Sequence, residues 1–575
     1  MRYAEQKIKG NKIRGIEQEY PVSVNALATA TSGLNPSLLV NSVIRGLKRR
    51  RFLVDVPWDV TMEVSQEEHE SKISSSYGDN GSRIYNDMGH LEIATPSYNN
   101  PFDAVAYDKA SEIYAFIGSR EASLSLKKKI VIHKNNVANF FTTPRGGPGK
   151  GKEKRGRIKT NTYATHGNII TKRAACKDWS RVERALIPWV VARILFTGSG
   201  DVVSGGCIGK GDKSVKFVIS PRAIFVREKS SLSTTSRRGI LNTRDQPHAA
   251  HQYWRLHDIH YEALRSEYAI FLRDIAQALV ISAFESGFMD DAPELEDPVS
   301  AFKELSLDTR ESEWKMRLKN GEMTDAVSIL EFYLNAIEKM QESEGIEVSK
   351  WDEIGLNCLK DLVKDLEARR LDDYVDGIDW VTKLALLVNY EPKSPSEGIS
   401  ICNQYAVLDE SVLYLYFLGL DDEKRSIDTD KRDCPCLFNP EDSLAFAKSK
   451  LRQVDWSSLP ERVRYAVGNA PEQTRDFFRA KLLKGYGSQI RRVNWSKLVL
   501  DEATILLDEP FMLNKEEMEM EMELDVEVGG EMIRNADADL KLKDILAKAK
   551  RLYHDKVSFS DQTFLKFAKA KKKGG

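Results

Sequence analysis

The chain has 575 residues, with 85 lysines and arginines against 86 aspartates and glutamates, for a formal net charge of −1. Domains that bind nucleic acid are usually clearly basic, so we expect no nucleic-acid partner. No apolar run reaches the ~18 residues that a membrane-spanning helix needs, and residues 1–7 lack the apolar core of a signal peptide. Six cysteines are few for so long a chain, which fits a reducing compartment. We therefore expect a cytoplasmic protein with no membrane partner.

Strand-like and helical stretches follow one another along the first half of the chain. Residues 129–133 and 215–219 are β-branched and apolar, and turn residues bound them, which predicts strands. Residues 189–195 and 268–284 carry the pattern of apolar helices, and residues 298–385 place apolar residues at helical spacing among charged ones. This mixture predicts an α+β protein in which an antiparallel sheet carries helices on one side.

Two short segments place ionisable side chains on one face of a strand. Arg83, Tyr85 and Asp87 alternate along the chain, as do Glu17 and Glu19 upstream, so the members of each set share a strand face. A cation, a phenol and carboxylates on one face suit a metal–nucleotide site, because Mg²⁺ takes oxygen ligands from carboxylates and phosphates. A solvent-facing acidic edge strand would account equally well for either segment taken alone.

These segments belong to a series of blocks that stand in a fixed order along the chain. The blocks are Gly15–Tyr20 (GIEQEY), Arg83–Thr95 (RIYNDMGHLEIAT), Lys134–Asn136 (KNN), Arg238–Ala249 (RGILNTRDQPHA), Trp254–His257 (WRLH), Asp379–Trp380, Thr474–Arg475 and Asn494–Trp495. In sequence and order they resemble the family of Pup ligases and Pup deamidases (depupylases), which are relatives of glutamine synthetase and the carboxylate–amine ligases. The twelve-residue block at 238–249 is the most specific of them.

The resemblance implies an architecture for the whole chain. The fold would be α+β, with a glutamine synthetase-like antiparallel sheet, helices packed on one side of it, and a small C-terminal domain. The expected divisions are a catalytic domain at 1–440, the small domain at 441–530 and a basic, helical or flexible tail at 531–575.

The resemblance also implies two cofactors, ATP and Mg²⁺, and a set of site residues. The expected metal ligands are Glu17, Glu19, Tyr85, Glu92 and His248. The expected nucleotide contacts are Arg83, Thr95, Arg238, Arg244 and Trp495, although the arginines and His248 would suit substrate carboxylates as well as phosphates.

Asp87 is the expected catalytic residue. In hydrolysis it would act as a nucleophile or as the base that activates water, and in ligation it would deprotonate an incoming lysine. Two alternatives stay open at this point: Asp87 as a spectator of the metal shell, and His248 as a structural histidine.

Two features favour hydrolysis over ligation. Only Met88 and Gly89 separate Asp87 from His90, which is the shorter spacing typical of the deamidases, and the long polar segment at 58–80 resembles the linker of that branch. We therefore expect an ATP-dependent amidase or isopeptidase, with the nucleotide not consumed stoichiometrically, that removes a Pup-like modifier from substrate lysines or deamidates its C-terminal glutamine. The partners would be that modifier and its lysine-conjugated proteins. The alternatives are an ATP-consuming ligase that joins the modifier's C-terminal glutamate to lysines, and a non-catalytic homologue that only binds the modifier.

The chain also departs from the family pattern. Relatives read His-Glu-Asn where this chain has His166, Gly167 and Asn168, and Gln246 replaces the usual glutamate. If the missing acid is a metal ligand, one metal position is weakened or lost. The glycine-rich basic stretch at 143–157 is an expected insertion.

Overall fold

The computed structural model describes residues 12–24, 35–60, 75–142, 157–209, 212, 214–309, 313–343, 348–413, 454, 456–500, 503–508, 510, 524–528, 531–535 and 563–567. The basic stretch at 143–156, most of the segment at 58–80, and the expected domain boundary at 440–441 lie outside the described residues.

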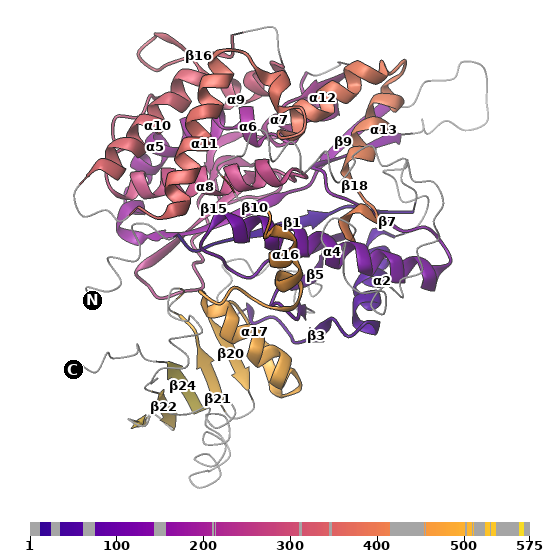
Figure 1. The fold of residues 1–575 in the computed structure, drawn as a ribbon, viewed down its shortest axis with the longest axis vertical. Coiled ribbons are helices and arrows are strands. Elements are labelled where there is room, and N and C mark those ends of the chain that lie inside the picture. The colour runs from indigo at the N-terminus through magenta and orange to yellow at the C-terminus, as the bar shows by residue number, and fades with distance from the viewer. Residues whose placement is uncertain are drawn as a thin grey trace.

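A nine-stranded sheet forms the centre of the molecule (Figure 1). Its strands, in order across the sheet, are β13 (Glu228–Ser231), β14 (Gly239–Asn242), β15 (Tyr253–Tyr261), β10 (Thr165–Lys172), β1 (Arg14–Tyr20), β6 (His90–Ala94), β5 (Arg83–Asp87), β4 (Ser76–Gly78) and β3 (Leu53–Asp55). Neighbouring strands run antiparallel, except that β13 and β14 are parallel. The central strand β1 alternates buried and half-buried residues along its length, as a strand with one covered face does.

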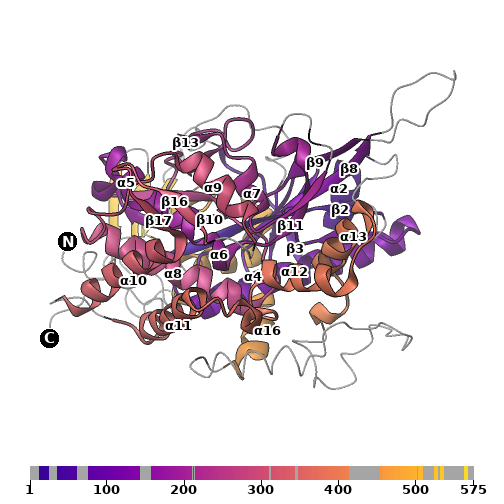
Figure 2. The ribbon, with the colours of Figure 1, turned by 90° about the horizontal axis from the view of Figure 1, so that it is seen from above.

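Helices pack in two layers against one face of this sheet (Figures 1 and 2). The longer helices are α2 (Pro36–Arg49), α4 (Pro101–Leu126), α5 (Trp179–Ala192), α8 (Glu267–Glu285), α10 (Ala326–Glu342) and α11 (Lys350–Glu367). The remaining helices are α6 (Ile194–Thr197), α7 (Pro221–Ile224), α9 (Pro298–Leu307), α12 (Asp379–Tyr390), α13 (Pro395–Ala406), α16 (Leu459–Gly468) and α17 (Arg475–Tyr486). Helices α2, α4 and α8 contact the sheet, while α10 and α11 lie outside α8. The predicted α+β class, with helices on one side of an antiparallel sheet, is confirmed.

Local sequence explains where α2 and α4 begin and how closely they pack. Asn35 and Asn100 accept backbone hydrogen bonds from the first turns, and a proline follows each of them, which is a favourable helix start. The two helices approach at Gly118, where a Cβ atom would lie 2.6 Å from a methyl group of Val43. Only glycine permits so close an approach of α4 to α2 at this point.

Smaller strand groups surround the main sheet. They are the three-stranded sheet of β18 (Val407–Leu408), β7 (Val131–His133) and β2 (Val22–Ser23), and the pairs of β8 (Val137–Thr142) with β9 (Arg157–Thr162), β11 (Asp201–Ser204) with β12 (Val215–Val218), and β16 (Lys315–Arg317) with β17 (Met323–Asp325). The strands predicted near 129–133 and 215–219 are thus present as β7 and β12, and the predicted helices near 189–195, 268–284 and 298–385 are present as well.

A six-stranded sheet and α17 lie on the other side of the main sheet from α5, α8 and α11 (Figure 1). Its strands, in order across the sheet, are β19 (Ile490–Val493), β20 (Lys497–Leu500), β21 (Ala503–Leu506), β24 (Thr563–Phe567), β22 (Leu524–Val528) and β23 (Glu531–Asn535). The expectation of a helical or flexible tail at 531–575 is wrong for β23 and β24, which pair with strands of the preceding segment. Threonine and aromatic residues in 563–567 favour a strand there.

Candidate active site

The candidate site lies on the face of the main sheet that the helices leave uncovered. Tyr20 of β1 belongs to the apolar core under the helices, and Ile16 on the same strand face is buried, so Glu17 and Glu19 project from the opposite face. In the strand register Glu19 stands beside Glu92 of β6, which stands beside Tyr85 of β5. One row across three strands therefore holds two carboxylates and a phenol.

Three carboxylates gather at this row. Glu19, Asp87 and Glu92 offer oxygen atoms that all lie within 4.8 Å of one another. The Tyr85 hydroxyl donates a hydrogen bond to Glu92, and burial, followed by the charge of Glu92, holds the pKa of Tyr85 well above its usual value. Carboxylates this close repel one another, and a hard divalent cation between them would relieve the repulsion. This donor set therefore fits Mg²⁺.

A second group with metal-ligand chemistry lies beside the first. Glu17, His166 of β10 and His257 of β15 offer ligand atoms within 4.8 Å of one another. Glu17 accepts hydrogen bonds from Asn168 Nδ2 at 3.0 Å and from His166 Nδ1 at 3.2 Å. Burial alone would raise the pKa of Glu17, but the His166 hydrogen bond, together with the neighbouring His257, His166 and Arg255 side chains, outweighs it and lowers that pKa well below its usual value.

The two histidines of this group were not predicted as site residues. Burial, and then the charge of Arg255, lower the pKa of His257 well below its usual value, so its imidazole is neutral near pH 7 and keeps a lone pair for a ligand. His257 ends the motif block at 254–257, and His166 stands in the His-Gly-Asn stretch that departs from the family pattern, but their approach to Glu17 depends on the pairing of β1, β10 and β15.

A small cavity of about 70 Å³ adjoins Glu17 at one end of the site. Thr95, His248, Arg475 and Trp495 line it. Small-molecule sites usually measure about 300–1,000 Å³, so this cavity holds only part of a nucleotide in the present side-chain arrangement. The Thr95 hydroxyl accepts a hydrogen bond from the Ile16 backbone at 3.1 Å, so it also joins β6 to β1. Contact of Thr95 and Trp495 with ATP remains a prediction.

Arg83 lies between two aromatic rings near this cavity. Its guanidinium carbon is 3.8 Å from the ring centroid of Trp58 and 4.0 Å from that of Tyr85. The Trp58 ring in turn meets Trp495 edge-on, at 6.1 Å between centroids. Trp58, which was not predicted, therefore joins Arg83 to Trp495, and such cation–π contacts fix the direction of a guanidinium.

Two other predicted site residues, His248 and Arg244, lie in different parts of the site. His248 stacks edge-on against Trp58 at 5.9 Å, and burial, then the charges of Arg255 and Arg475, keep its pKa well below the usual value. Among the described residues, neither group of potential metal ligands contains His248. Arg244 is half-buried after β14, and its charge contributes to the lowered pKa of His257.

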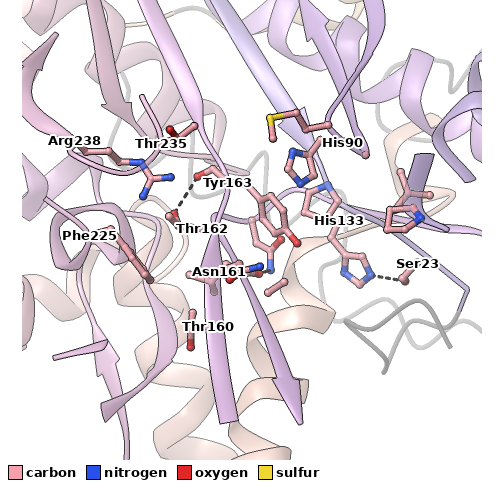
Figure 3. A pocket seen from close by; sticks show the side chains of 18 residues that line it. Ser23, His90, His133, Thr160, Asn161, Thr162, Tyr163, Phe225, Thr235 and Arg238 are labelled. Carbon is pink, nitrogen blue, oxygen red and sulfur yellow. Dashed lines mark hydrogen bonds between the residues drawn. The ribbon is translucent and has the colours of Figure 1, made fainter. Parts of the chain in front are cut away.

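A larger pocket of about 500 Å³ lies at the other end of the site (Figure 3). Arg238, Thr235 and Phe225 lie on one side of it and His133 and Ser23 on the other, with His90 and Tyr163 between them (Figure 3). Arg238 thus lines this pocket and not the cavity beside Trp495, which separates two residues that were predicted to share a ligand.

His90 connects the large pocket with the carboxylates. Its ring packs edge-on against Tyr163 at 4.5 Å between centroids, and its Nδ1 lies 3.9 Å from Glu19 Oε2. It is also the register partner of Asp87. His90 belongs to the motif block at 83–95, so the sequence marks it as a candidate site residue. Only the folded hairpin, however, brings its ring between the pocket and the carboxylates.

The register of β10 bears on position 167, where relatives have an acid. Gly167 stands opposite Ile16, whereas His166 stands opposite Glu17, so a side chain at 167 would point to the helix-covered face. The Tyr261 ring occupies that space, and a Cβ atom on Gly167 would lie 2.7 Å from it. The loss of the family's glutamate therefore leaves the carboxylate cluster intact.

The sequence comparisons give one family. The family model described as Pup-ligase protein matches residues 12–143 and 157–405. The chain is 29% identical to a depupylase of Acidothermus cellulolyticus, over 85% of this chain and 91% of that one. It is 28% identical to a Pup–protein ligase of Acidimicrobium ferrooxidans, over 88% and 97%, and 30% identical to a Pup deamidase/depupylase of Mycolicibacterium smegmatis, over 73% and 74%.

Solved structures agree on the fold. The complex between Pup and its ligase PafA matches with a TM-score of 0.63 and 21% identity, over 88% of this chain and 91% of that one. PafA in complex with ADP matches with a TM-score of 0.58 and 22% identity, over 82% of this chain and 92% of that one.

In the described part of the chain, no helix has the length and apolar character needed to cross a membrane. From its motifs, its fold and the extent of the family match, the chain belongs to the Pup-ligase protein family.

Proposed function

We propose that this protein is an ATP-dependent amidase and isopeptidase that releases a Pup-like modifier from substrate lysines and deamidates the modifier's C-terminal glutamine. The nucleotide and Mg²⁺ would form a fixed part of the site and would not be consumed in each turnover. Relatives named as depupylases and as a Pup–protein ligase both match this chain, so the direction of the reaction is argued from the site.

The hairpin that carries Asp87 is the observation on which the proposal rests. The loop from β5 to β6 holds only Met88 and Gly89, with φ angles of 52° and 96°, the signs of a tight two-residue turn. Asp87 and His90 are therefore direct cross-strand neighbours, whose Cβ atoms lie about 5 Å apart in such pairs. A nucleophile or base and a proton donor thus stand side by side at the edge of the large pocket.

The residues divide the reaction between them. Arg238 would hold the terminal carboxylate of the modifier, as guanidinium groups do in bidentate pairs. Asp87 would remove a proton from the water that attacks the amide carbon, or would attack this carbon itself to form an anhydride that water then hydrolyses to free the modifier and Asp87. In either case the bond from the carbon to the lysine nitrogen would break, and His90 would supply the proton that this nitrogen needs to leave. Bound Mg²⁺ would polarise oxygen atoms at the reacting centre, and Glu19 and Glu92 would hold it, with Glu17 beside the nucleotide.

Ligation is the second candidate. It is favoured by the match to the Acidimicrobium ferrooxidans ligase over 97% of that protein. In a ligase the γ-phosphate of ATP must be transferred to the modifier's glutamate, because a free carboxylate and an amine do not condense in water without activation.

The choice of nucleotide separates the two reactions. Purified protein would be given Mg²⁺, a non-hydrolysable ATP analogue and Pup joined through its terminal glutamate to the lysine of a short peptide; in parallel it would be given ATP, Pup ending in glutamate and the free peptide. We expect release of the peptide in the first reaction and no conjugate in the second. Conjugate that forms only with hydrolysable ATP, with no cleavage under any nucleotide, would make the protein a ligase, and binding of Pup without either reaction would make it a non-catalytic homologue.

A further inference from the structure

Met88 has an unusual position for an apolar residue. It occupies the first position of the β5–β6 turn with a φ of 52°, in the left-handed region that favours glycine, asparagine and aspartate. Its side chain is 66% exposed and lines the large pocket. A methionine here pays for backbone strain and gains no burial in return, which points to a role outside folding.

Hydrogen bonds and a close contact hold the backbone of this turn against α2. Asn86 Oδ1 accepts a hydrogen bond from the Gly89 backbone at 2.9 Å, and Asn86 Nδ2 donates to Asn41 Oδ1 of α2 at 3.0 Å. A Cβ atom on Gly89 would lie 3.1 Å from Pro36 at the start of α2. These contacts tie the turn to α2 and leave only the Met88 side chain to adapt.

Met88 shares the lining of the large pocket with two other apolar residues near the start of the chain. Pro21 and Val22 also line the pocket and directly precede Ser23, which lies across the pocket from Arg238 (Figure 3). Strand β2 with Val22 packs against α2, which begins at Pro36. The lining of the pocket therefore combines the Arg238 cation with an apolar part made by Met88, Pro21 and Val22, and it includes His90, the register partner of Asp87.

We infer that Met88 is a specificity-determining residue that holds the methylene chain of the modified lysine. The inference rests on the proposed function: a modifier whose carboxylate lies at Arg238 and whose amide lies at Asp87 must extend its lysine side across the apolar part of the lining. Four methylene groups joined to an amide nitrogen are apolar along their whole length, and a flexible thioether adapts to such chains. A C-terminal glutamine, whose leaving group is ammonia, has no atoms at this apolar part.

Binding in an inactive background tests the inference without relying on turnover. Variants would be made in Asp87→Asn protein, and the dissociation constants of two probes would be measured: Pup ending in glutamine, and Pup joined to the lysine of a short peptide. Met88→Asn removes the apolar side chain and suits the turn, Met88→Leu keeps an apolar side chain, and Met323→Asn is the matched control at another exposed methionine.

We expect Met88→Asn to weaken binding of the lysine conjugate about fivefold, as loss of contact with one or two methylene groups would, and to leave the glutamine-ended probe unchanged. Met88→Leu should restore most of the affinity, and Met323→Asn should change neither probe. The melting temperature of Met88→Asn should not fall, because asparagine relieves the strain. Equal effects on both probes, or none on the conjugate, would overturn the inference. Selective weakening of the conjugate in a protein that fails to cleave would reject the proposed reaction and keep Met88 as a lysine contact.

Discussion

Asp87 of β5 lies beside three ionisable side chains that come from two other strands, β1 and β6. Glu19 of β1 and Glu92 of β6 lie within 4.8 Å of it, and His90 is its partner across the hairpin. Asp87 therefore lies beside the carboxylates that fit Mg²⁺ and next to a histidine, the side chain that most often transfers protons in catalysis. This arrangement makes Asp87 the residue whose charge matters most to the proposed reaction.

Replacing that charge without changing the shape is the direct test. We expect Asp87→Asn to lower the rate of isopeptide cleavage by about 10²–10⁴-fold, the usual contribution of a general base, because the amide cannot attack or accept a proton. Nucleotide binding should persist, since the small cavity beside Trp495 is not lined by Asp87. Single-turnover cleavage and calorimetric titration with Mg²⁺-ATP would measure the two effects, with Asp79→Asn in the neighbouring loop as the control. A normal rate for Asp87→Asn would remove this residue from the mechanism.

At the scale of elements, strand β10 shows how a family position can change without loss of the site. Its two faces serve different purposes, because His166 and Asn168 reach Glu17 while Gly167 faces the layer under α8. On that second face the ring of Tyr261 lies between the guanidinium groups of Arg193 and Arg273, at 5.2 and 4.6 Å from the ring centroid.

Gly167 should therefore resist even the smallest side chain. A Cβ atom 2.7 Å from a ring that cannot move freely is overpacked, and we expect Gly167→Ala to cost about 1–3 kcal/mol of unfolding free energy. Urea denaturation would measure this cost, which should largely disappear in a Tyr261→Ala background because the two residues are in contact. Gly485→Ala in α17, with no atom within 4 Å of its added Cβ, is the control. A cost that persists without the Tyr261 ring would contradict this account.

At the scale of the whole molecule, α17 joins the six-stranded sheet to the main sheet. Asp476 accepts hydrogen bonds from the backbone and hydroxyl groups of Ser97, at 2.6 Å for the backbone, and from Arg479 Nε at 2.5 Å. Arg475 donates to the backbone oxygens of His248 and Leu507. Burial alone would raise the pKa of Asp476, but the charges of Arg479 and Arg475 and the Ser97 hydrogen bonds outweigh it and lower that pKa.

This junction should support both stability and the cavity beside Trp495. Asp476→Asn leaves two buried arginines without their carboxylate, and we expect a loss of about 3 kcal/mol together with weaker Mg²⁺-ATP binding. Because the pKa of Asp476 is lowered on folding, its stabilisation is present above the usual carboxyl pKa of about 4 and is lost as the pH falls below it. The difference in unfolding free energy between wild type and Asp476→Asn should therefore become smaller in acid.

The control is Glu294→Gln, at the exposed pair with Lys319, which should lower the unfolding free energy by at most about 1 kcal/mol. If Asp476→Asn is destabilised but binds Mg²⁺-ATP with unchanged affinity, the junction does not support the cavity beside Trp495.

The sequence by itself determined which side chains share a strand face. Alternation along 83–87 and 17–19 depends only on the local geometry of a strand, so the faces that carry Arg83, Tyr85, Asp87 and the two glutamates were predictable, as was the short turn at Met88 and Gly89. The order of the motif blocks was sufficient to indicate the family and its α+β sheet.

The tertiary structure alone decided which strands lie side by side and in what register. Slipping a strand by one residue moves every side chain to the other face, and no local pattern shows that Gly167 faces Ile16 while His166 faces Glu17. For the same reason the sequence did not bring His257 to Glu17, place Arg238 and Trp495 in separate cavities, or join α17 to the loop after β6. Those contacts link residues far apart along the chain, and they form because burial of the common core brings their elements together.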